Sequence, residues 1–483
     1  MLGAHEGLTR RRLLGGVAAG AVAAAVAPCL PAAASAREAA TTTATTATAT
    51  TATATSRGAR PNVLLVLLDD LGWGELGVYG QDRIRTPAID GLARRGARFT
   101  QAYATPTCAP SRAALMQGRH SGHASVRTNG QATGGLRADD VTVAGVLREA
   151  GYRTALIGKW GLGRDAADSP SHPNRQGFDH FFGYIDQRQA HDYWPAHLWR
   201  NHRRVSYPRN RGADVTYAPR LFTEEALRYV DRAARDGAPF FLTLAYNTPH
   251  APNVAPRRAP YRNKRWPKGE RNHAAQITWT DTQIGKVVRR LRRRGLLDDT
   301  LVLVTSDNGP HREGATYGRV GSTLHHRVEF FDSNGPLRGA KRSLYEGGIR
   351  VPLVAHLPRS LRQGSTLRRG AVIRTPVALW DLFPTFVDLA RAETPPGLDG
   401  VSLVPLLRGR SLSARPYLYW ESHDRGYDQA VRWGQWKLIR RSGGRRELYD
   451  LRRDKRERKN LAARRPEIVR VGERLIDRSV TPR

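Results

Sequence analysis

The chain has 483 residues, of which 40% are hydrophobic and 25% charged, so it is long enough for one large domain or two domains with substantial cores. Its 78 lysine and arginine residues against 43 aspartate and glutamate residues give a formal charge of +35. The cations are mostly arginines scattered along the chain, without a zinc-finger, RNA-binding or helix-turn-helix pattern. This argues against a nucleic-acid partner, although such a charge attracts anionic substrates.

The N-terminal residues 1–36 have the pattern of a secretory signal peptide. Consecutive arginines (10–12) precede two leucines and a run rich in Ala, Gly and Val, which ends in small residues. This pattern resembles a twin-arginine leader and predicts export of a folded protein by the twin-arginine translocase of a bacterium. A membrane anchor and a lipoprotein signal at Cys29 are the alternatives. Pro28 and Pro31 interrupt the apolar run, and a proline directly before the cysteine disfavours lipid attachment, so no stable membrane anchor is expected.

Residues 37–59 consist largely of threonine and alanine and are predicted to form a disordered linker. Cleavage near residue 36 would remove Cys29, so that Cys108 would be the only cysteine of the exported protein. No intramolecular disulfide could then form. An exported protein with a single thiol requires a specific reason to keep it.

Ordered structure is predicted to begin with the apolar run Val63–Asp69, which has the pattern of a strand buried on both faces of a parallel sheet. Similar strands that end in polar residues are predicted within 152–163, 239–252 and 299–310. Helical stretches separate them, at 86–100, 141–151 and 284–297. This alternation predicts an α/β domain over residues 60–400, with a mostly parallel central sheet flanked by helices.

The pattern changes after about residue 400. Short strand-like segments follow at 417–422, 429–441 and 445–451, and a charged helical tail begins at about residue 464. We therefore predict a smaller C-terminal α+β subdomain with an antiparallel sheet over residues 401–483.

Acidic and amide side chains follow two of the predicted strands. Asp69 and Asp70 end one strand, and Asp307 and Asn308 end another. Loops at the carboxyl ends of strands are where open α/β sheets bind ligands, and these four side chains supply the oxygen atoms that Ca²⁺ or Mg²⁺ prefers. Taken singly, each pair also has a purely structural interpretation as a helix cap or a turn.

Cationic side chains and a histidine complete a set that suits an anionic ester. Lys159, Lys341 and Arg112 supply positive charge, and His250 supplies a titratable group, although a core histidine beside Pro249 is the simpler interpretation of that residue alone.

The segment "CAPSRAALMQGR", which contains Cys108, matches the signature CxPSRxxxLxxGR. Further matches follow in order along the chain: "NVLLVLLDDLGWGELGVYG", "GKWGLG", "GFDHFFGY", "YNTPHAP", "TSDNGP", "RGAKRSLYEGGIRVP" and "LYDLRRDKRERKNLA". On these motifs the chain is identified as a member of the sulfatase family, within the alkaline-phosphatase-like superfamily. The resemblance covers essentially the whole chain from about residue 60.

The resemblance implies that a formylglycine-generating enzyme oxidises Cys108 to 3-oxoalanine (formylglycine). The hydrated aldehyde has two hydroxyl groups, of which one attacks sulfur and the other expels sulfate by reforming the aldehyde. A sulfated serine would instead need a second hydrolytic attack.

The resemblance also implies roles for the other site residues. Asp69, Asp70, Asp307 and Asn308, together with residue 108, would bind Ca²⁺, with Mg²⁺ as the alternative. Arg112 would hold the hydrate, Lys159 and Lys341 would bind the sulfate oxygens, and His250 would protonate the leaving oxygen.

One position departs from the family pattern. Many members read GKWHLG where this chain reads "GKWGLG", so Gly161 replaces a histidine that would contact the formylglycine hydroxyl. Nearby candidates for a substitute are His172, His180 and His191, and we take His191 as the first choice because its surroundings are polar and aromatic.

The sequence thus predicts a secreted, extracytoplasmic sulfatase that hydrolyses carbohydrate or aryl sulfates. A phosphonate monoester or phosphodiester hydrolase of the same superfamily is one alternative, since it can share the CxPSR core. A catalytically silent polyanion-binding protein is the other, suggested by the charge and by Gly161. The intact Cys108 and the set of charged residues argue against it.

Overall fold

The computed structural model describes residues 60–256, 259–312, 326–412, 415–424 and 426–480. These residues belong to one compact unit, Ser56–Arg483. The predicted signal peptide and linker lie outside the described residues. Within the described ranges, none of the helices combines the length and apolar character that crossing a membrane would need.

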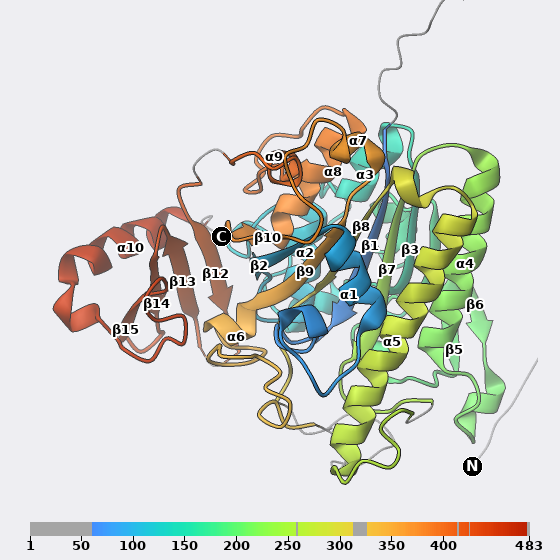
Figure 1. Cartoon of the computed structure of the whole chain (residues 1–483), viewed down its shortest axis with the longest axis horizontal. Helices are drawn as coiled ribbons and strands as arrows, with labels where there is room; N and C mark the ends of the chain where they lie inside the picture. Colours follow the sequence, from blue (N-terminus) through green and yellow to red (C-terminus); the bar gives the residue numbers. More distant parts are fainter. Residues whose placement is uncertain (1–59, 257–258, 313–325, 413–414, 425, 481–483) are drawn as a thin grey trace, which may run out of the picture. The chain divides into compact units, whose positions relative to one another are not determined.

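A large mixed sheet forms the centre of this unit (Figure 1). Among the described residues it has eleven strands in the order β10-β2-β9-β8-β1-β7-β3-β4-β5-β6, with β11 paired to β2. The strands from β8 to β4 run parallel. Strand β9 is antiparallel to both of its neighbours, β8 and β2, and at the other end of the sheet β5 is antiparallel to β4 and β6. The strands are β1 Asn62–Asp69, β2 Ala97–Tyr103, β3 Arg153–Lys159, β4 His180–Tyr184, β5 His197–Arg200, β6 Arg203–Ser206, β7 Phe240–Pro249, β8 Thr300–Ser306, β9 Arg350–His356, β10 Ala371–Ile373 and β11 Val377–Ala378.

Strand β1 shows why the sheet is buried on both faces. Every residue of "NVLLVLLD" is buried, and successive side chains enter different hydrophobic clusters. Val63 and Leu65 pack in one cluster, and Leu64 and Val66 pack in the other. Because side chains alternate across a strand, a continuous apolar run of this kind needs a layer of helices on each face.

Helices supply these two layers. Residues of α2, α3 and α8 belong to the first cluster, and residues of α1, α4 and α5 belong to the second. Figure 1 shows α4 and α5 side by side along the sheet. The α-helices are α1 Pro87–Arg95, α2 Cys108–Gln117, α3 Val143–Glu149, α4 Ala218–Asp236, α5 Lys268–Arg293, α6 Glu346–Ile349, α7 Arg359–Arg362, α8 Leu382–Ala390, α9 Val404–Leu407 and α10 Pro466–Arg478.

A second, antiparallel sheet follows late in the chain, in the order β12-β13-β14-β15. Its strands are β12 Leu418–Ser422, β13 Asp428–Trp433, β14 Trp436–Arg440 and β15 Arg446–Asp450. Helix α10 packs on one face through Ile476, and Trp420 on the other face joins a cluster with Tyr103 of the main sheet. The two sheets confirm the predicted fold class, and the domain boundary near residue 400 stays a prediction.

One predicted helix was too long. The sequence indicated a helix over 86–100, but α1 ends at Arg95 and β2 begins at Ala97. At Gly96 the chain passes so close to β9 that a Cβ atom would lie 1.9 Å from the carbonyl oxygen of Ala355. The pairing of β2 with β9 therefore overrides the helical pattern of the preceding residues.

Candidate active site

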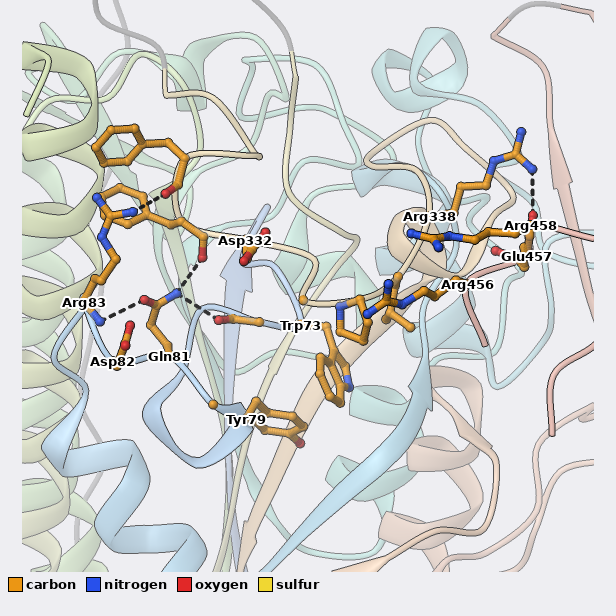
Figure 2. A pocket seen from close by; sticks show the side chains of 17 residues that line it. Trp73, Tyr79, Gln81, Asp82, Arg83, Asp332, Arg338, Arg456, Glu457 and Arg458 are labelled. Carbon is orange, nitrogen blue, oxygen red and sulfur yellow. Dashed lines mark hydrogen bonds between the residues drawn. The ribbon is translucent and has the colours of Figure 1, made fainter. Parts of the chain in front are cut away.

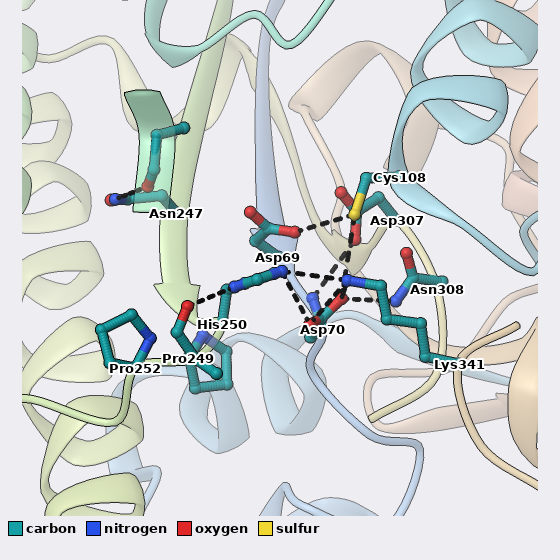
Figure 3. A network of polar contacts seen from close by, with 12 residues as sticks. Asp69, Asp70, Cys108, Asn247, Pro249, His250, Pro252, Asp307, Asn308 and Lys341 are labelled. Atoms are coloured by element: carbon teal, nitrogen blue, oxygen red, sulfur yellow. Dashed lines mark hydrogen bonds and ion pairs between the residues drawn. The ribbon is translucent and has the colours of Figure 1, made fainter. Parts of the chain in front are cut away.

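The carboxyl ends of the central strands bring the predicted site residues together (Figure 3). Leu68 pairs with Ser306 in the parallel register of β1 and β8, so the residues that follow these two strands emerge next to each other. Lys159 ends β3, and His250 follows β7 directly. The full set that converges here is Asp69, Asp70, Cys108, Arg112, Lys159, His250, Asp307, Asn308 and Lys341.

Cys108 is the first residue of α2 and has no exposed surface. Its thiol donates a hydrogen bond of 3.3 Å to Asp69 Oδ1, and its Sγ lies 3.9 Å from Asp70 Oδ1. Burial raises the pKa of the Cys108 thiol far above its ordinary value, and this outweighs the opposing effect of the neighbouring lysines. The unmodified side chain is therefore held as a thiol, which is a poor nucleophile.

Buried carboxylates and buried cations alternate around Cys108. Lys159 Nζ lies 2.5 Å from Asp69 Oδ2, and Lys341 Nζ lies 3.0 Å from Asp70 Oδ2. Burial by itself would raise the pKa of Asp69, but Lys159 and other nearby cations hold it well below its ordinary value. Asp69 is thus ionised and available as an anionic ligand.

Asp307, the residue that follows β8, is the third carboxylate of the site. Arg112 binds its Oδ2 with two guanidinium nitrogens, Nε at 3.1 Å and Nη2 at 2.7 Å, and donates its third hydrogen bond to the carbonyl of Lys159. Burial and the charge of Asp69 raise the pKa of Asp307 to about 6, against the opposing effect of Arg112. Arg112 therefore orients the Asp307 carboxylate and favours its ionised form, whereas burial and the charge of Asp69 favour the protonated form.

The backbone at Asp70 turns its carboxylate toward the same point. Asp70 has a φ of 67°, in the left-handed region that a residue with a side chain adopts at a cost of about 1–3 kcal/mol. Its amide donates a 3.2 Å hydrogen bond to Asp307 Oδ1. Strain of this kind persists where surrounding contacts hold it, and it is typical of functional sites.

These residues fit a hard divalent cation. Asn308 Nδ2 donates to Asp70 Oδ1 at 2.6 Å, and within the described chain the buried Oδ1 of Asn308 has no hydrogen-bond partner. Asn308 thus offers an unpaired, buried amide oxygen on a side chain that contacts the Asp70 carboxylate. Ca²⁺ and Mg²⁺ prefer such a set of oxygen donors.

His250 lies on the β7 side of the carboxylates. Its Nδ1 donates to the carbonyl of Ala251 at 2.5 Å, which leaves Nε2 as the acceptor facing Lys341 Nζ at 3.0 Å and Asp70 Oδ2 at 3.4 Å. Burial, followed by the charge of Lys341, lowers the pKa of His250 well below its ordinary value. The imidazole is thus neutral, and its Nε2 accepts a hydrogen bond from the Lys341 ammonium group.

Of the three histidines considered as substitutes at Gly161, only His191 reaches the site. It lies in a short 3₁₀ helix, η4 (Gln189–His191), and its ring stacks on that of His250 with centroids 4.4 Å apart. His172 Nε2 lies 3.2 Å from the carbonyl of Asn201, and His180 Nε2 lies 2.9 Å from Glu225, so both serve other parts of the fold.

Two site residues were missed by the sequence interpretation. Gln187 extends its amide oxygen over Gly161, and the ring of His311 stacks beside that of His250 with centroids 5.8 Å apart. His311 could have been noticed because it directly follows the "TSDNGP" motif. Gln187 lies in the irregular loop after β4 and has no charge or motif that marks it.

Two cavities differ in their relation to this site. A cavity of about 240 Å³ is lined by His191, Trp194 and Arg211, and the ring of His191 stacks on that of His250. A larger cavity of about 910 Å³, shown in Figure 2, is lined by Trp73 and Arg456 among others and includes none of the predicted site residues. The larger of these two cavities is therefore not the one that contacts a predicted site residue.

Comparison with known proteins agrees with this geometry. A family model described as Sulfatase matches residues 61–392, and one described as N-sulphoglucosamine sulphohydrolase, C-terminal, matches residues 339–480. Steryl-sulfatase of Mus musculus is 32% identical over 455 residues, covering 77% of this chain and 69% of the relative. N-acetylgalactosamine-6-sulfatase of Homo sapiens is 33% identical over 385 residues, covering 74% and 68%.

Solved structures give the same result. The crystal structure of Ps i-CgsB in complex with k-i-k-neocarrahexaose has a TM-score of 0.75 and 28% identity, and the match covers 87% of this chain and 92% of the other. Phosphonate monoester hydrolase of Agrobacterium radiobacter, with a TM-score of 0.61, 21% identity and coverage of 86% and 95%, shares the fold.

The α/β sheet carries at its carboxyl edge charged side chains that could hold a metal ion, and together with the matches above it defines a hydrolase of the alkaline-phosphatase-like class. Within that class the chain belongs to the sulfatase family and is a sulfuric ester hydrolase. Both expectations from the CxPSR signature are thereby confirmed.

Proposed function

We propose that the protein is a formylglycine-dependent sulfatase, in which residue 108 acts as 3-oxoalanine beside a bound Ca²⁺, with Mg²⁺ as the alternative. The observation that carries the proposal is the position of Cys108, whose Sγ lies 3.3 Å from Asp69 inside a ring of matched buried charges. A buried, protonated thiol serves no purpose there as a nucleophile. A hydrated aldehyde at residue 108 would supply one hydroxyl to attack sulfur and a second to expel sulfate.

The metal would be held by Asp69, Asp70, Asp307 and Asn308. A divalent cation supplies positive charge for the nucleophile and for the sulfate oxygens. Arg112 fixes Asp307 by two hydrogen bonds and lies one helical turn from residue 108, where it screens developing negative charge. Lys159 and Lys341 are the groups that bind sulfate oxygens, because both ammonium groups already point at this ring of carboxylates.

The leaving oxygen requires a proton, and the pair of Lys341 and His250 supplies it. Lys341 Nζ donates to His250 Nε2 at 3.0 Å, so one proton lies between the two groups. His250 Nε2 faces the carboxylates, while its Nδ1 is fixed by the carbonyl of Ala251. This arrangement orients a general acid toward the Asp70 carboxylate.

We propose a carbohydrate or aryl sulfate ester as the substrate. The similarity to Ps i-CgsB in complex with k-i-k-neocarrahexaose supports a saccharide, and the charge of +35 favours an anionic one. Trp194 and Arg211 line the cavity beside His191, where an aromatic face and a cation suit a sulfated sugar.

Mass spectrometry of the peptide that contains residue 108 tests the covalent part of the proposal. We expect a loss of mass corresponding to conversion of the thiol to the aldehyde, together with release of inorganic sulfate from sulfated saccharides or an aryl sulfate. Sulfatase activity from a protein that carries only the thiol would overturn the role of formylglycine. A strong preference for an aryl phosphodiester would favour the phosphonate monoester hydrolase alternative.

Metal removal tests the cation. Exhaustive chelation should abolish sulfate release and lower the melting temperature, and added Ca²⁺ should restore both. For a ligand at about 100 times its Kd, binding stabilises the folded state by about 2.7 kcal/mol. The Asp307→Asn variant should need more Ca²⁺ for the same shift, and a variant with an unchanged Ca²⁺ titration would contradict the assignment of this ligand.

We also propose export by the twin-arginine translocase, with residues 1–36 as the leader and a formylglycine-generating enzyme acting beforehand in the cytoplasm. This rests on the arginines and the weakly apolar run of the leader. Replacing Arg11 and Arg12 by lysine should leave the protein inside the cell with its activity intact. Continued export of the double variant would contradict this route.

A further inference from the structure

Gly161 leaves a space at the catalytic site that a loop side chain fills. Gly161 has a φ of 73°, and a Cβ atom there would lie 2.7 Å from Gln187 Oε1, 3.3 Å from Lys159 Cε and 3.5 Å from Arg112 Cδ. Two of these neighbours are the proposed sulfate-binding lysine and the arginine that holds Asp307. The position taken by the Gln187 amide therefore belongs to the reaction site.

The backbone fixes Gln187 in this position. The amide of Gly161 donates to the carbonyl of Ile185 at 3.2 Å, which ties the loop after β4 to the end of β3. The Oε1 atom of Gln187 is buried and, among the described residues, has no hydrogen-bond partner. An unpaired buried acceptor costs about 1–3 kcal/mol, so a donor that arrived with the mature residue 108 or with the substrate would stabilise this position.

The place of this oxygen suggests its partner. In a histidine, Nδ1 is separated from Cβ by a single atom, so an acceptor 2.7 Å from the Cβ position at residue 161 lies about where a histidine ring nitrogen would be. The chain thus replaces a side chain just after β3 with one from the neighbouring loop. Glycine at residue 161 is required for this exchange, since any Cβ would displace the amide.

We propose that Gln187 Oε1 accepts a hydrogen bond from the hydroxyl of hydrated residue 108 that expels sulfate, an inference that rests on the proposed function. In that step the bond between the residue 108 carbon and the sulfate oxygen breaks, and its electron pair leaves with sulfate. The hydroxyl oxygen forms the carbonyl double bond, and its proton passes to water. An amide oxygen does not take up this proton, but it orients the O–H bond and polarises it.

The geometry separates this step from protonation of the leaving group. His191 stacks on His250, which contacts Lys341 and Asp70. Gln187 lies instead beside Lys159 and Arg112. We therefore assign sulfate expulsion to the Gln187 side, in place of the earlier expectation that His191 serves it.

The test compares Gln187→Leu with Gln189→Leu. Gln189 begins η4 two residues later, and its Oε1 is likewise buried without a partner among the described residues. Its Nε2 bonds His197, and Gln189 is not among the nearest neighbours of the Cβ position at Gly161, so it is a matched control. With an aryl sulfate, Gln187→Leu should release a first equivalent of phenol rapidly and then turn over about 10- to 100-fold more slowly, the effect of losing one hydrogen bond to a developing charge. Intact-protein mass spectrometry of the quenched reaction should show residue 108 carrying an added sulfate group. Gln189→Leu should show neither effect.

A conservative variant provides rescue if Gln187→Leu folds poorly. Gln187→Glu keeps an acceptor at the same place, so sulfated residue 108 should not accumulate, while KM rises because the added negative charge repels the anionic substrate. Accumulation of the sulfated protein in Gln187→Glu would overturn the proposal.

Two further results would also overturn it. One is a Gln187→Leu protein with wild-type turnover and no sulfated residue 108, and the other is accumulation in His191→Leu but not in Gln187→Leu. If the active wild-type protein carried no aldehyde at residue 108, the proposed function itself would be contradicted, and this inference would be contradicted with it. Measuring the aldehyde in every variant separates the two failures.

Discussion

At the scale of single residues, Cys108 has the most restricted surroundings of the site. Its side chain is fully buried against Asp69, and its chemistry depends on the conversion proposed above. We expect Cys108→Ala to lower kcat/KM for an aryl sulfate by at least about a thousandfold, because the nucleophile is lost. The melting temperature with Ca²⁺ should change little, since only a small buried group is removed. Activity within tenfold of wild type would exclude residue 108 as the nucleophile.

Gly161 and Gln187 form a coupled pair of residues. Gly161→Ala should destabilise the protein by about 1 kcal/mol through its φ of 73°, and it should also displace the Gln187 amide, 2.7 Å from the new Cβ. In the Gly161→Ala/Gln187→Ala double variant the clash is absent, so the losses of activity should be less than additive. Chemical denaturation and kcat measurements on the wild type, the two single variants and the double variant provide this double-mutant cycle. Strict additivity would show that the two positions are independent.

Among the secondary-structure elements, α1 and α5 are joined by a buried carboxylate. Asp281 of α5 accepts hydrogen bonds from the amides of Ala88 at 3.1 Å and Ile89 at 2.8 Å, in the first turn of α1. Burial raises the pKa of Asp281 from 3.8 to about 7, despite these two bonds. Since the folded state binds this proton more tightly than the unfolded chain, the contribution is fully present below pH 4 and is lost as the pH rises through 7.

Asp281→Asn tests this pH dependence. The amide cannot ionise, so the free energy of unfolding of wild type relative to Asp281→Asn should decrease between pH 5 and pH 8. Urea denaturation at several pH values measures the difference, and kcat should be unaffected because Asp281 lies outside the site. A difference that stays constant between pH 5 and pH 8 would contradict the raised pKa, because a carboxyl whose pKa the helix amides had lowered is already fully ionised in that range.

The elements also show what the sequence could and could not predict. Apolar runs ending in polar residues placed Asp69 and Asp307 at adjacent strand ends, because parallel strands put their carboxyl ends at one edge. The end of α1 was missed, since close passage against β9 at Gly96 is a tertiary effect. Gln187 was missed because an irregular loop has no periodicity, and only the folded chain brings it over Gly161.

At the scale of the whole molecule, a buried lysine ties the C-terminal sheet to the catalytic segment. Lys437 of β14 is fully buried and lies 3.0 Å from Glu346 Oε1 and 2.9 Å from Glu457 Oε1. Glu346 begins α6, a few residues after Lys341. The antiparallel sheet thus anchors the segment from which a proposed sulfate-binding lysine extends.

Lys437→Met should therefore affect both stability and activity. It removes the cation that two buried carboxylates share, so that among the described residues Glu346 keeps only its ion pair with Arg350, and this destabilises the protein by about 3–5 kcal/mol. KM for the sulfate ester should rise as Lys341 loses its support. Arg440→Met is the matched control, because its ion pair with Asp477 lies at the surface and contributes about 0–1 kcal/mol. Denaturation and steady-state kinetics on both variants measure these effects. Equal behaviour of the two would contradict the anchoring role of Lys437.

The complete burial of Cys108 sets an order of events during biosynthesis. A separate enzyme cannot reach a side chain with no exposed surface, so the proposed oxidation would compete in time with folding of the nascent chain. Export of a folded protein would come only after that competition has been decided. Each molecule that folds first would leave the cell as a stable protein without a nucleophile. The active fraction of a preparation would therefore report how fast the chain closed over α2 relative to its modification, and slower folding at low temperature should raise it.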